Sequence, residues 1–235
     1  MTRIKLWAHR GSHGAGGPLE NTRPAFARAL AEAADGIELD VHLSADGVPL
    51  VFHDETTGRL ALGGLDVALA REPAAVLRAL PLVGGETMPT LAEVLARVGG
   101  AVPVNVEIKD ATALDAVLAV LAARGATDPI LLSSFSADAM AEARLRAPHL
   151  PRAFLCEALA EGELEAELER LDAAAWHPPA HLVTPARVAA CRARGVAIHV
   201  WTVNDPARAR ALAAVGVTGI FTDCAGAMRA ALAAG

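Results

Sequence analysis

The fold is decided by two short stretches, IELDVH at residues 37–42 and VNVEIK at residues 104–109. In each stretch aliphatic and polar side chains alternate, so the two kinds point to opposite faces of a β-strand. Helices that pack on a strand cover its aliphatic face and leave the polar side chains on the other face. We therefore interpret both stretches as barrel strands with helices outside and polar side chains inside. A strand with one solvated polar face would show the same alternation, and periodicity by itself does not separate the two interpretations.

The segments around these stretches repeat one unit. Short apolar, β-branched runs alternate with longer Ala-, Leu- and Arg-rich segments of helical period, which is typical of parallel strands joined by crossover helices. Eight such units predict an α/β fold, a closed (β/α)8 or TIM barrel. The predicted strands are Ile4–Ala8, Gly36–Val41, Val102–Ile108, Ile130–Phe135, Arg152–Cys156, Ala173–Trp176, Val196–Thr202 and Gly219–Thr222. The predicted helices are Arg23–Ala34, Leu91–Val98, Ala111–Arg124, Ala137–Ala147, Glu161–Leu171, Pro185–Arg194, Pro206–Val215 and Ala225–Ala233.

One strand-like segment, Val48–Phe52, interrupts this repeat after the second strand. Only the turn Ser44–Gly47 precedes it, which is far too short for a parallel crossover, so we expect an antiparallel hairpin. The hairpin would return His53 to a place roughly opposite Asp40. Residues 55–88, rich in Gly and Pro with a short helical pattern near Pro73–Leu80, are interpreted as a small insertion. No repeat or linker divides residues 1–235, which are assigned to one domain.

Composition excludes several classes of partner. The chain has 21 Lys and Arg against 27 Asp and Glu, a net charge of −6 with scattered bases, which argues against nucleic-acid binding. No apolar run approaches the roughly 18 residues of a membrane span, and the N-terminus lacks a secretory pattern. We therefore expect a cytoplasmic protein without stable membrane insertion. Cys156, Cys191 and Cys224 are far apart, and we expect buried thiols rather than a zinc site.

Three carboxylates are expected to meet at the C-terminal mouth of the barrel, where enzymes of this fold keep their sites. They are Glu38, Asp40 and Glu107, all on the inward polar face. Crowded carboxylates repel one another, and a bound divalent cation relieves that repulsion. An all-oxygen ligand set favours Mg²⁺, Ca²⁺ or Mn²⁺ over zinc. Lys109, on the same face as Glu107, is placed to neutralise an anionic ligand of that cation.

Two histidines are expected beside these carboxylates. His9 ends the first strand and His53 ends the hairpin, and two imidazoles suit the two proton transfers of a hydrolysis or a phosphoryl transfer. Arg10 offers a planar fork for phosphate oxygens. A purely structural ion pair between Arg10 and Glu20 is the alternative.

Other residues near the mouth keep two interpretations each. Trp201 is either an apolar wall for a substrate or part of the core. Asp223 is either a hydrogen-bond acceptor behind the site or a helix cap, and Asn21 or Thr22 resembles a cap before an early-helix proline. The Gly-rich segment 12–18 lacks the dinucleotide and Walker fingerprints, so it is interpreted as a loop over the mouth.

These motifs, in order, strongly resemble the glycerophosphodiester phosphodiesterase family from Ala8 to Asp223. The residues that carry the resemblance are His9-Arg10-Gly11, Glu20-Asn21-Thr22, Glu38-Leu39-Asp40-Val41, Asp46-Gly47, His53-Asp54, Glu107-Ile108-Lys109, Trp201-Thr202-Val203-Asn204 and Phe221-Thr222-Asp223.

The resemblance implies a phospholipase-C-like barrel that hydrolyses deacylated glycerophospholipids, small-molecule substrates, to an alcohol and glycerol 3-phosphate with a divalent cation. It also implies that His9 and His53 act as general acid and base. Arg10 and Lys109 would hold the phosphate, and the metal ligands would be Glu38, Asp40 and Glu107. Two alternatives are a related barrel phosphodiesterase that acts on lysophospholipids and a non-catalytic barrel that binds phosphorylated ligands. The head group, the metal, the nucleophile, the division of labour between the histidines and the oligomeric state are left open by the sequence.

Overall fold

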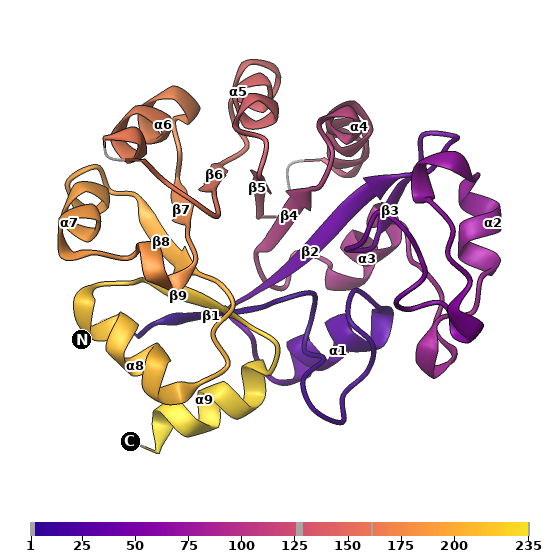
Figure 1. The fold of residues 1–235 in the computed structure, drawn as a ribbon, viewed down its shortest axis with the longest axis horizontal. Helices are drawn as coiled ribbons and strands as arrows, with labels where there is room; N and C mark the ends of the chain where they lie inside the picture. Colours follow the sequence, from indigo (N-terminus) through magenta and orange to yellow (C-terminus); the bar gives the residue numbers. More distant parts are fainter. Residues whose placement is uncertain (1–2, 126–128, 161, 235) are drawn as a thin grey trace.

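A closed barrel of parallel strands surrounded by helices forms the body of the molecule (Figure 1). The computed structural model describes residues 3–125, 129–160 and 162–234. Within them one sheet of nine strands has the order β1-β9-β8-β7-β6-β5-β4-β2-β3, and an additional β1–β2 pairing closes the barrel. Eight strands run parallel, as predicted: β1 Lys5–Ala8, β2 Gly36–Leu43, β4 Val104–Ile108, β5 Ile130–Ser134, β6 Arg152–Leu155, β7 Ala175–His177, β8 Ala197–Val200 and β9 Gly219–Thr222.

The helices follow the predicted order with small shifts at their ends. The first predicted helix ends before Ala33, which has a left-handed φ of 55°, and the predicted helix Ala111–Arg124 starts with a 3₁₀ turn, Ala111–Ala113. Glu161, the predicted start of another helix, lies outside the described residues. The α-helices are α1 Arg23–Ala31, α2 Ala74–Ala79, α3 Leu91–Val98, α4 Leu114–Arg124, α5 Ala137–Arg146, α6 Glu163–Leu171, α7 Pro185–Ala193, α8 Pro206–Val215 and α9 Ala225–Ala233.

The main core lies between the barrel and the helices. All six aliphatic residues of the alternating pattern in β2 and β4 are buried in it: Ile37, Leu39, Val41, Val104, Val106 and Ile108. A smaller cluster inside the barrel contains Trp7, Leu131 and Phe221. The sequence-based assignment of aliphatic side chains to the outside of the barrel wall is therefore confirmed, and the polar side chains of β2 and β4 point inward.

The hairpin after β2 is antiparallel, as predicted. Strand β3, Pro49–Val51, pairs with β2 with Val51 opposite Val41, and the Phe52 amide donates to the Asp40 carbonyl over 3.1 Å. Gly47 turns the chain with a φ of 77°, a conformation that favours glycine. The insertion adds the 3₁₀ turns Leu62–Gly64, Leu69–Arg71 and Val83–Gly85 and the short helix α2, and it has a small core of its own around Phe52, Leu69, Leu77 and Met88.

Two features bear on the environment of the chain. Every helix in the described ranges falls short of the length and hydropathy that a membrane crossing demands. Cys156 and Cys191 are buried free thiols, as expected, but Cys224 is only half-buried because it sits where β9 ends at the mouth.

Candidate active site

The structure brings the three predicted metal ligands together at the C-terminal ends of β2 and β4. Parallel pairing places Asp40 opposite Glu107 and Glu38 opposite Asn105. Each of Glu38, Asp40 and Glu107 offers one carboxylate oxygen, and the three oxygens lie within 4.8 Å of one another. Strand alternation therefore builds an acidic cluster from two adjacent strands.

The electrostatics of this cluster fit a divalent cation. Burial first, and then the charges of Asp40 and Glu107, raise the pKa of Glu38 well above its ordinary value. Burial and Asp40 likewise raise the pKa of Glu107 to about 7. One oxygen of Glu38, Oε1, is buried without a hydrogen-bond partner among the described residues. Repelling oxygens with an unpaired acceptor among them are the surroundings in which a hard cation binds.

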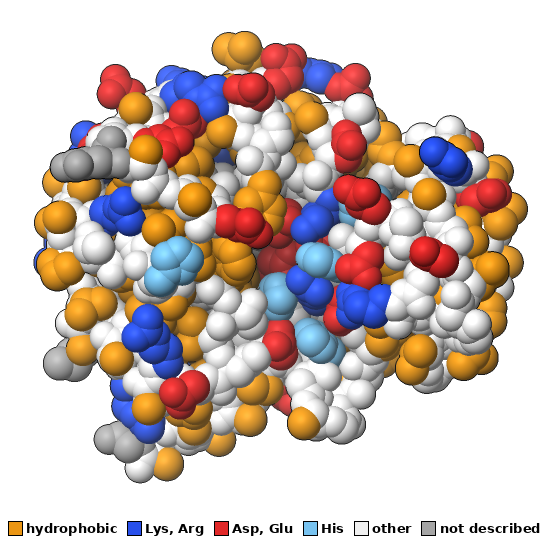
Figure 2. Space-filling view, viewed as in Figure 1, with side chains coloured by type: hydrophobic (Ala, Val, Ile, Leu, Met, Phe, Trp, Pro, Cys, Tyr) orange, Lys and Arg blue, Asp and Glu red, His pale blue; other side chains and the backbone are white. Residues whose placement is uncertain are grey.

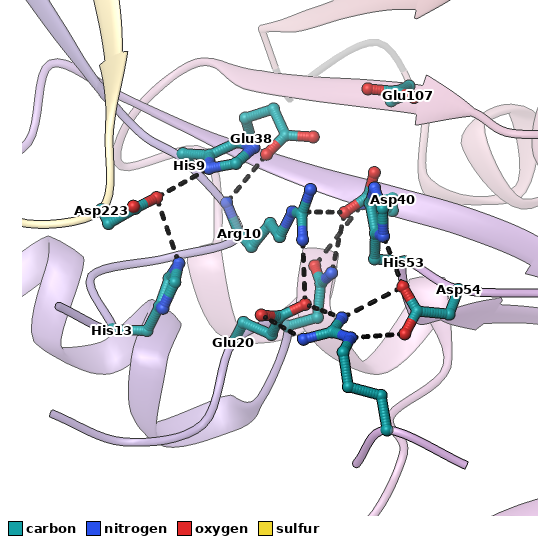
Figure 3. Close-up of polar contacts among 12 residues, drawn as sticks. His9, Arg10, His13, Glu20, Glu38, Asp40, His53, Asp54, Glu107 and Asp223 are labelled. Carbon is teal, nitrogen blue, oxygen red and sulfur yellow. Dashed lines mark hydrogen bonds and ion pairs between the residues drawn. The ribbon is translucent and has the colours of Figure 1, made fainter. Parts of the chain in front are cut away.

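Two basic side chains border the cluster. The Arg10 amide donates to Glu38 Oε2 over 2.8 Å, and its guanidinium lies 3.4 Å from Asp40 and 3.0 Å from Glu20. Lys109 Nζ lies 2.7 Å from Glu107 and 3.4 Å from Asp40. Burial by itself would lower the pKa of Lys109, but the charges of Glu107 and Asp40 raise it. Arg10 thus makes the ion pair with Glu20 and still borders the acidic cluster (Figure 3).

His9 is held by a carboxylate from the opposite end of the chain. Its Nδ1 donates to Asp223 Oδ1 over 2.7 Å, and the Asn204 amide donates to Asp223 Oδ2 over 2.6 Å. His13 Nε2 lies 3.2 Å from the same Oδ1. Burial by itself would raise the pKa of Asp223, but contacts with His13, His9 and Asn204 hold it far below its ordinary value. The bond at Nδ1 leaves Nε2 of His9 to take or give a proton.

His53 is oriented in the same way by its chain neighbour. Its Nδ1 donates to Asp54 Oδ1 over 2.6 Å, and Arg59 in the insertion donates to both Asp54 and Glu20. Burial alone would raise the pKa of Asp54, but Arg59 and His53 lower it to about 2. Burial lowers the pKa of His53 in spite of Asp40 and Asp54. Each histidine is thus hydrogen-bonded to a carboxylate, His9 to Asp223 and His53 to Asp54, as Figure 3 shows.

A pocket of about 390 Å³ joins these groups. His9, Arg10, His53 and Lys109 line it together with two of the carboxylates, and Phe135 and Trp201 form part of its wall. The Trp201 indole donates to the His177 carbonyl over 2.8 Å and packs against the cluster inside the barrel, so this residue belongs to the core as well as to the pocket wall. A larger cavity, about 870 Å³, opens among residues such as Trp7, Pro103 and Leu118, away from the acidic cluster.

Sequence reasoning missed several partners of the site. Asn21 does not cap a helix: its Nδ2 donates to Asp40 Oδ2 over 2.8 Å, and Thr22 holds the cap position without a capping hydrogen bond. The sequence predicts no role for His13, Asp54 or Arg59. The position of Asp54 directly after His53 is a signal for their contact, because adjacent residues can share a turn. Nothing local in the sequence points to Arg59.

Comparisons with known proteins agree with one another. The sequence profile of the glycerophosphoryl diester phosphodiesterase family matches residues 9–227. A glycerophosphodiester phosphodiesterase of Caldanaerobacter subterraneus subsp. tengcongensis is 33% identical over 215 residues, which are 87% of this chain and 88% of the relative. One of Bacillus altitudinis is 32% identical over 233 residues, 93% of this chain and 94% of the relative.

Solved structures show the same likeness. The glycerophosphodiester phosphodiesterase of Thermotoga maritima superimposes with a TM-score of 0.82 at 30% identity, over 98% of this chain and 99% of that one. An Oleispira antarctica phosphodiesterase in complex with its product sn-glycerol-3-phosphate superimposes with a TM-score of 0.89 at 28% identity, over 97% of this chain and 96% of that one.

Proposed function

Because the chain belongs to the glycerophosphoryl diester phosphodiesterase family and is thus an enzyme that hydrolyses glycerophosphodiesters, we propose that it does so with a divalent cation and two histidines. The products are an alcohol and sn-glycerol 3-phosphate, the product held by the Oleispira antarctica neighbour. One observation carries the proposal: two histidines, each hydrogen-bonded at Nδ1 to a carboxylate, line one pocket with the acidic cluster.

The cation belongs on Glu38, Asp40 and Glu107, whose oxygens already lie together. When bound, it supplies Lewis-acid stabilisation of charge on phosphate and hydroxyl oxygens. Arg10 and Lys109 border these carboxylates and neutralise part of their negative charge. Mg²⁺ and Ca²⁺ suit the oxygen ligands best, and Mn²⁺ is the next candidate.

Arg10 and Lys109 bind the phosphate. Both already contact the acidic cluster, so a phosphodiester held by them lies next to the carboxylates and between the histidines. Their positive charges stabilise the negative charge that gathers on the phosphoryl oxygens in the transition state.

His9 and His53 move the protons. Since each Nδ1–H is engaged by a carboxylate, each Nε2 can accept or donate a proton without a change of tautomer at Nδ1. One imidazole accepts the proton of the nucleophile. Water as nucleophile gives sn-glycerol 3-phosphate directly, whereas the neighbouring glycerol hydroxyl gives a cyclic phosphate that a water molecule then opens. The other protonates the departing alkoxide, and Asp223 and Asp54 stabilise the imidazolium in either role.

The proposal is tested with a panel of glycerophosphodiesters after chelation and re-addition of single cations, with the products identified. We expect metal-dependent release of sn-glycerol 3-phosphate and faster turnover of deacylated diesters than of a lysophospholipid. Faster turnover of the lysophospholipid would mean that lysophospholipids are the preferred substrates. No turnover above background with any cation would contradict the hydrolytic mechanism and favour a barrel that only binds phosphorylated ligands.

A further inference from the structure

A third histidine at the mouth of the barrel, His13, has no part in the proposed hydrolysis. In Figure 2 histidine side chains gather with acidic and basic ones at one border of the central hollow. The carboxylate of Asp223 already accepts hydrogen bonds from His9 and Asn204, which hold it in place behind His9. The contact of His13 with the same carboxylate is therefore not needed to orient His9, and it calls for another explanation.

The backbone of the loop after β1 holds His13 against Asp223. The amides of His13 and Gly14 both donate to the Asp223 carbonyl, over 3.0 and 2.7 Å. A Cβ atom on Gly14 would lie 2.9 Å from the Cβ of Cys224 and 3.1 Å from the Asp223 carbonyl oxygen, which is closer than side chains pack. Glycine at position 14 thus lets the loop lie directly on residues 223–224, and the position of His13 relative to Asp223 is set by the backbone.

Three possible metal ligands converge at this place. His9, His13 and Asp223 each offer one ligand atom, and the three atoms lie within 4.8 Å of one another. Asp223 Oδ1 lies 2.7 Å from His9 Nδ1 and 3.2 Å from His13 Nε2, and both rings point to the carboxylate in Figure 3. The buried Nε2 of His13 has no hydrogen bond to any described residue. Ligand atoms around a tetrahedral zinc ion are about 3.4 Å apart, so small side-chain movements are enough to enclose one.

The chemistry of these ligands differs from that of the acidic cluster. Two imidazole nitrogens and one carboxylate oxygen suit Zn²⁺, whereas carboxylate oxygens alone suit harder cations such as Mg²⁺ and Ca²⁺. The side chains of His9, His13 and Asp223 are 19, 20 and 25% exposed, so an ion can reach them from solvent. A water molecule would complete the tetrahedron. The two clusters at the mouth thus select different cations.

We propose that His9, His13 and Asp223 form a second metal site, which binds Zn²⁺ and thereby inhibits hydrolysis. A neutral imidazole has one N–H and one lone pair. Zn²⁺ on His9 takes the lone pair of Nδ1, and the proton of the ring moves to Nε2. That nitrogen can then accept no proton from a nucleophile, and a neutral ring is a poor proton donor to a leaving alkoxide. Inhibition therefore follows whichever role His9 has. Zinc binding stands by itself, whereas the inhibition rests on the proposed function.

Zinc affinity is measured first, without reference to activity, by competition with a chromophoric chelator in a large excess of Mg²⁺. In His13→Gln we expect the affinity to fall at least about 10-fold, because even the loss of an outer partner of a metal site costs that much. His149→Gln is the matched control, since His149 is an exposed histidine that precedes β6 at the opposite end of the barrel. It should bind Zn²⁺ as tightly as the wild type. Equal affinity in the wild type and His13→Gln would overturn the site.

Hydrolysis of sn-glycero-3-phosphocholine is then followed as Zn²⁺ is added, with each variant compared with its own zinc-free rate. The wild type and His149→Gln should lose activity over the range in which they bind Zn²⁺ and regain it with a zinc-selective chelator, whereas His13→Gln should need at least about 10-fold more Zn²⁺. Unchanged inhibition in His13→Gln would place the inhibitory ion in the acidic cluster and overturn the proposal. Zinc bound through His13 without inhibition would overturn the inhibitory role. No zinc-free hydrolysis with any cation would instead overturn the proposed function, while the measured zinc affinities still decide the site.

Discussion

The two catalytic candidates, His9 and His53, share one local design although they come from different parts of the barrel. Each uses Nδ1 to bind a carboxylate, Asp223 in one case and Asp54 in the other. The carboxylates fix the tautomer and the orientation of each ring, and they stabilise its protonated form. Loss of either carboxylate should therefore impair the same step as loss of the histidine it holds.

Removal of these groups gives the first prediction. His9→Ala and His53→Ala should each lower kcat on the order of 10² to 10⁴-fold. Asp223→Asn should give a smaller loss, because the ring remains but its tautomer is no longer fixed. Steady-state kinetics across pH 5 to 9 is the measurement. In the double variant of His9 and Asp223 the losses should not multiply, and bell-shaped pH profiles identical to wild type in both histidine variants would refute the roles.

A second prediction concerns His199, which is buried against His177 with the two ring nitrogens 3.2 Å apart. Burial, and then the charge of Lys5, lower the pKa of His199 to about 3. In the unfolded chain its pKa is about 6.5, so between these values the unfolded state binds more protons. The free energy of unfolding should therefore fall as the pH falls from about 6.5 towards 3.

Urea unfolding of wild type and His199→Gln at pH 7, 6 and 5 tests this. Between pH 7 and pH 5 the wild type should lose about 2 kcal/mol more than the variant. Equal losses in the two proteins would show that His199 titrates normally in the folded state. His177 was also given no role by the sequence, because a buried histidine pair comes from two strands and has no local signature.

Among the elements, the hairpin and its insertion matter most for the site. The hairpin delivers His53 to the mouth, and the insertion delivers Arg59, which donates to Asp54 and to Glu20. Glu20 in turn binds Arg10, so a chain of charges joins the insertion to the phosphate-binding candidates. The insertion is thereby tied to the catalytic end of the barrel rather than attached only through its own small core.

Arg59→Gln should loosen this chain. Without the guanidinium, Asp54 and Glu20 lose the partner that holds their pKa values near 2. We expect kcat to fall on the order of 10-fold, because the orientation of His53 becomes less well defined. Arg71→Gln, an exposed arginine of the same insertion, is the control and should retain full activity. Wild-type kinetics in Arg59→Gln would mean that Asp54 orients His53 without help.

Element order could be predicted from the sequence because periodicity is local. The alternation in residues 37–42 and 104–109 predicted which side chains enter the barrel, and the short turn at residues 44–47 predicted the antiparallel β3. The convergence of the carboxylates followed from strand alternation and fold together. The contacts of Asn21 with Asp40 and of Arg59 with Asp54 could not be predicted, since they depend on the path of loops in space.

At the scale of the whole molecule, negative charge is concentrated at the end of the barrel that holds the acidic cluster. The net charge is −6, and three carboxylates crowd one end of the barrel with their repulsion only partly offset by Arg10 and Lys109. A divalent cation that binds the folded state and not the unfolded chain should therefore stabilise the whole protein.

Thermal unfolding measures that stabilisation without reference to activity. At a cation concentration about 100 times the dissociation constant, the midpoint should rise on the order of 5 to 10 °C over the chelated protein. In Glu107→Gln the rise should shrink greatly while the circular dichroism spectrum stays the same. An equal rise in wild type and variant would place the cation elsewhere, and no rise with any divalent cation would contradict a resident metal.

The seam between β1 and β9 has a consequence for biosynthesis. Ala8 pairs with Thr222, the His9 amide donates to the Thr222 carbonyl over 3.0 Å, and Asp223 follows directly. A ribosome therefore makes His9 214 residues before its carboxylate partner. Until β9 has emerged and docked against β1, the nascent chain holds an imidazole without its orienting group, so we expect hydrolytic competence only after the barrel has closed.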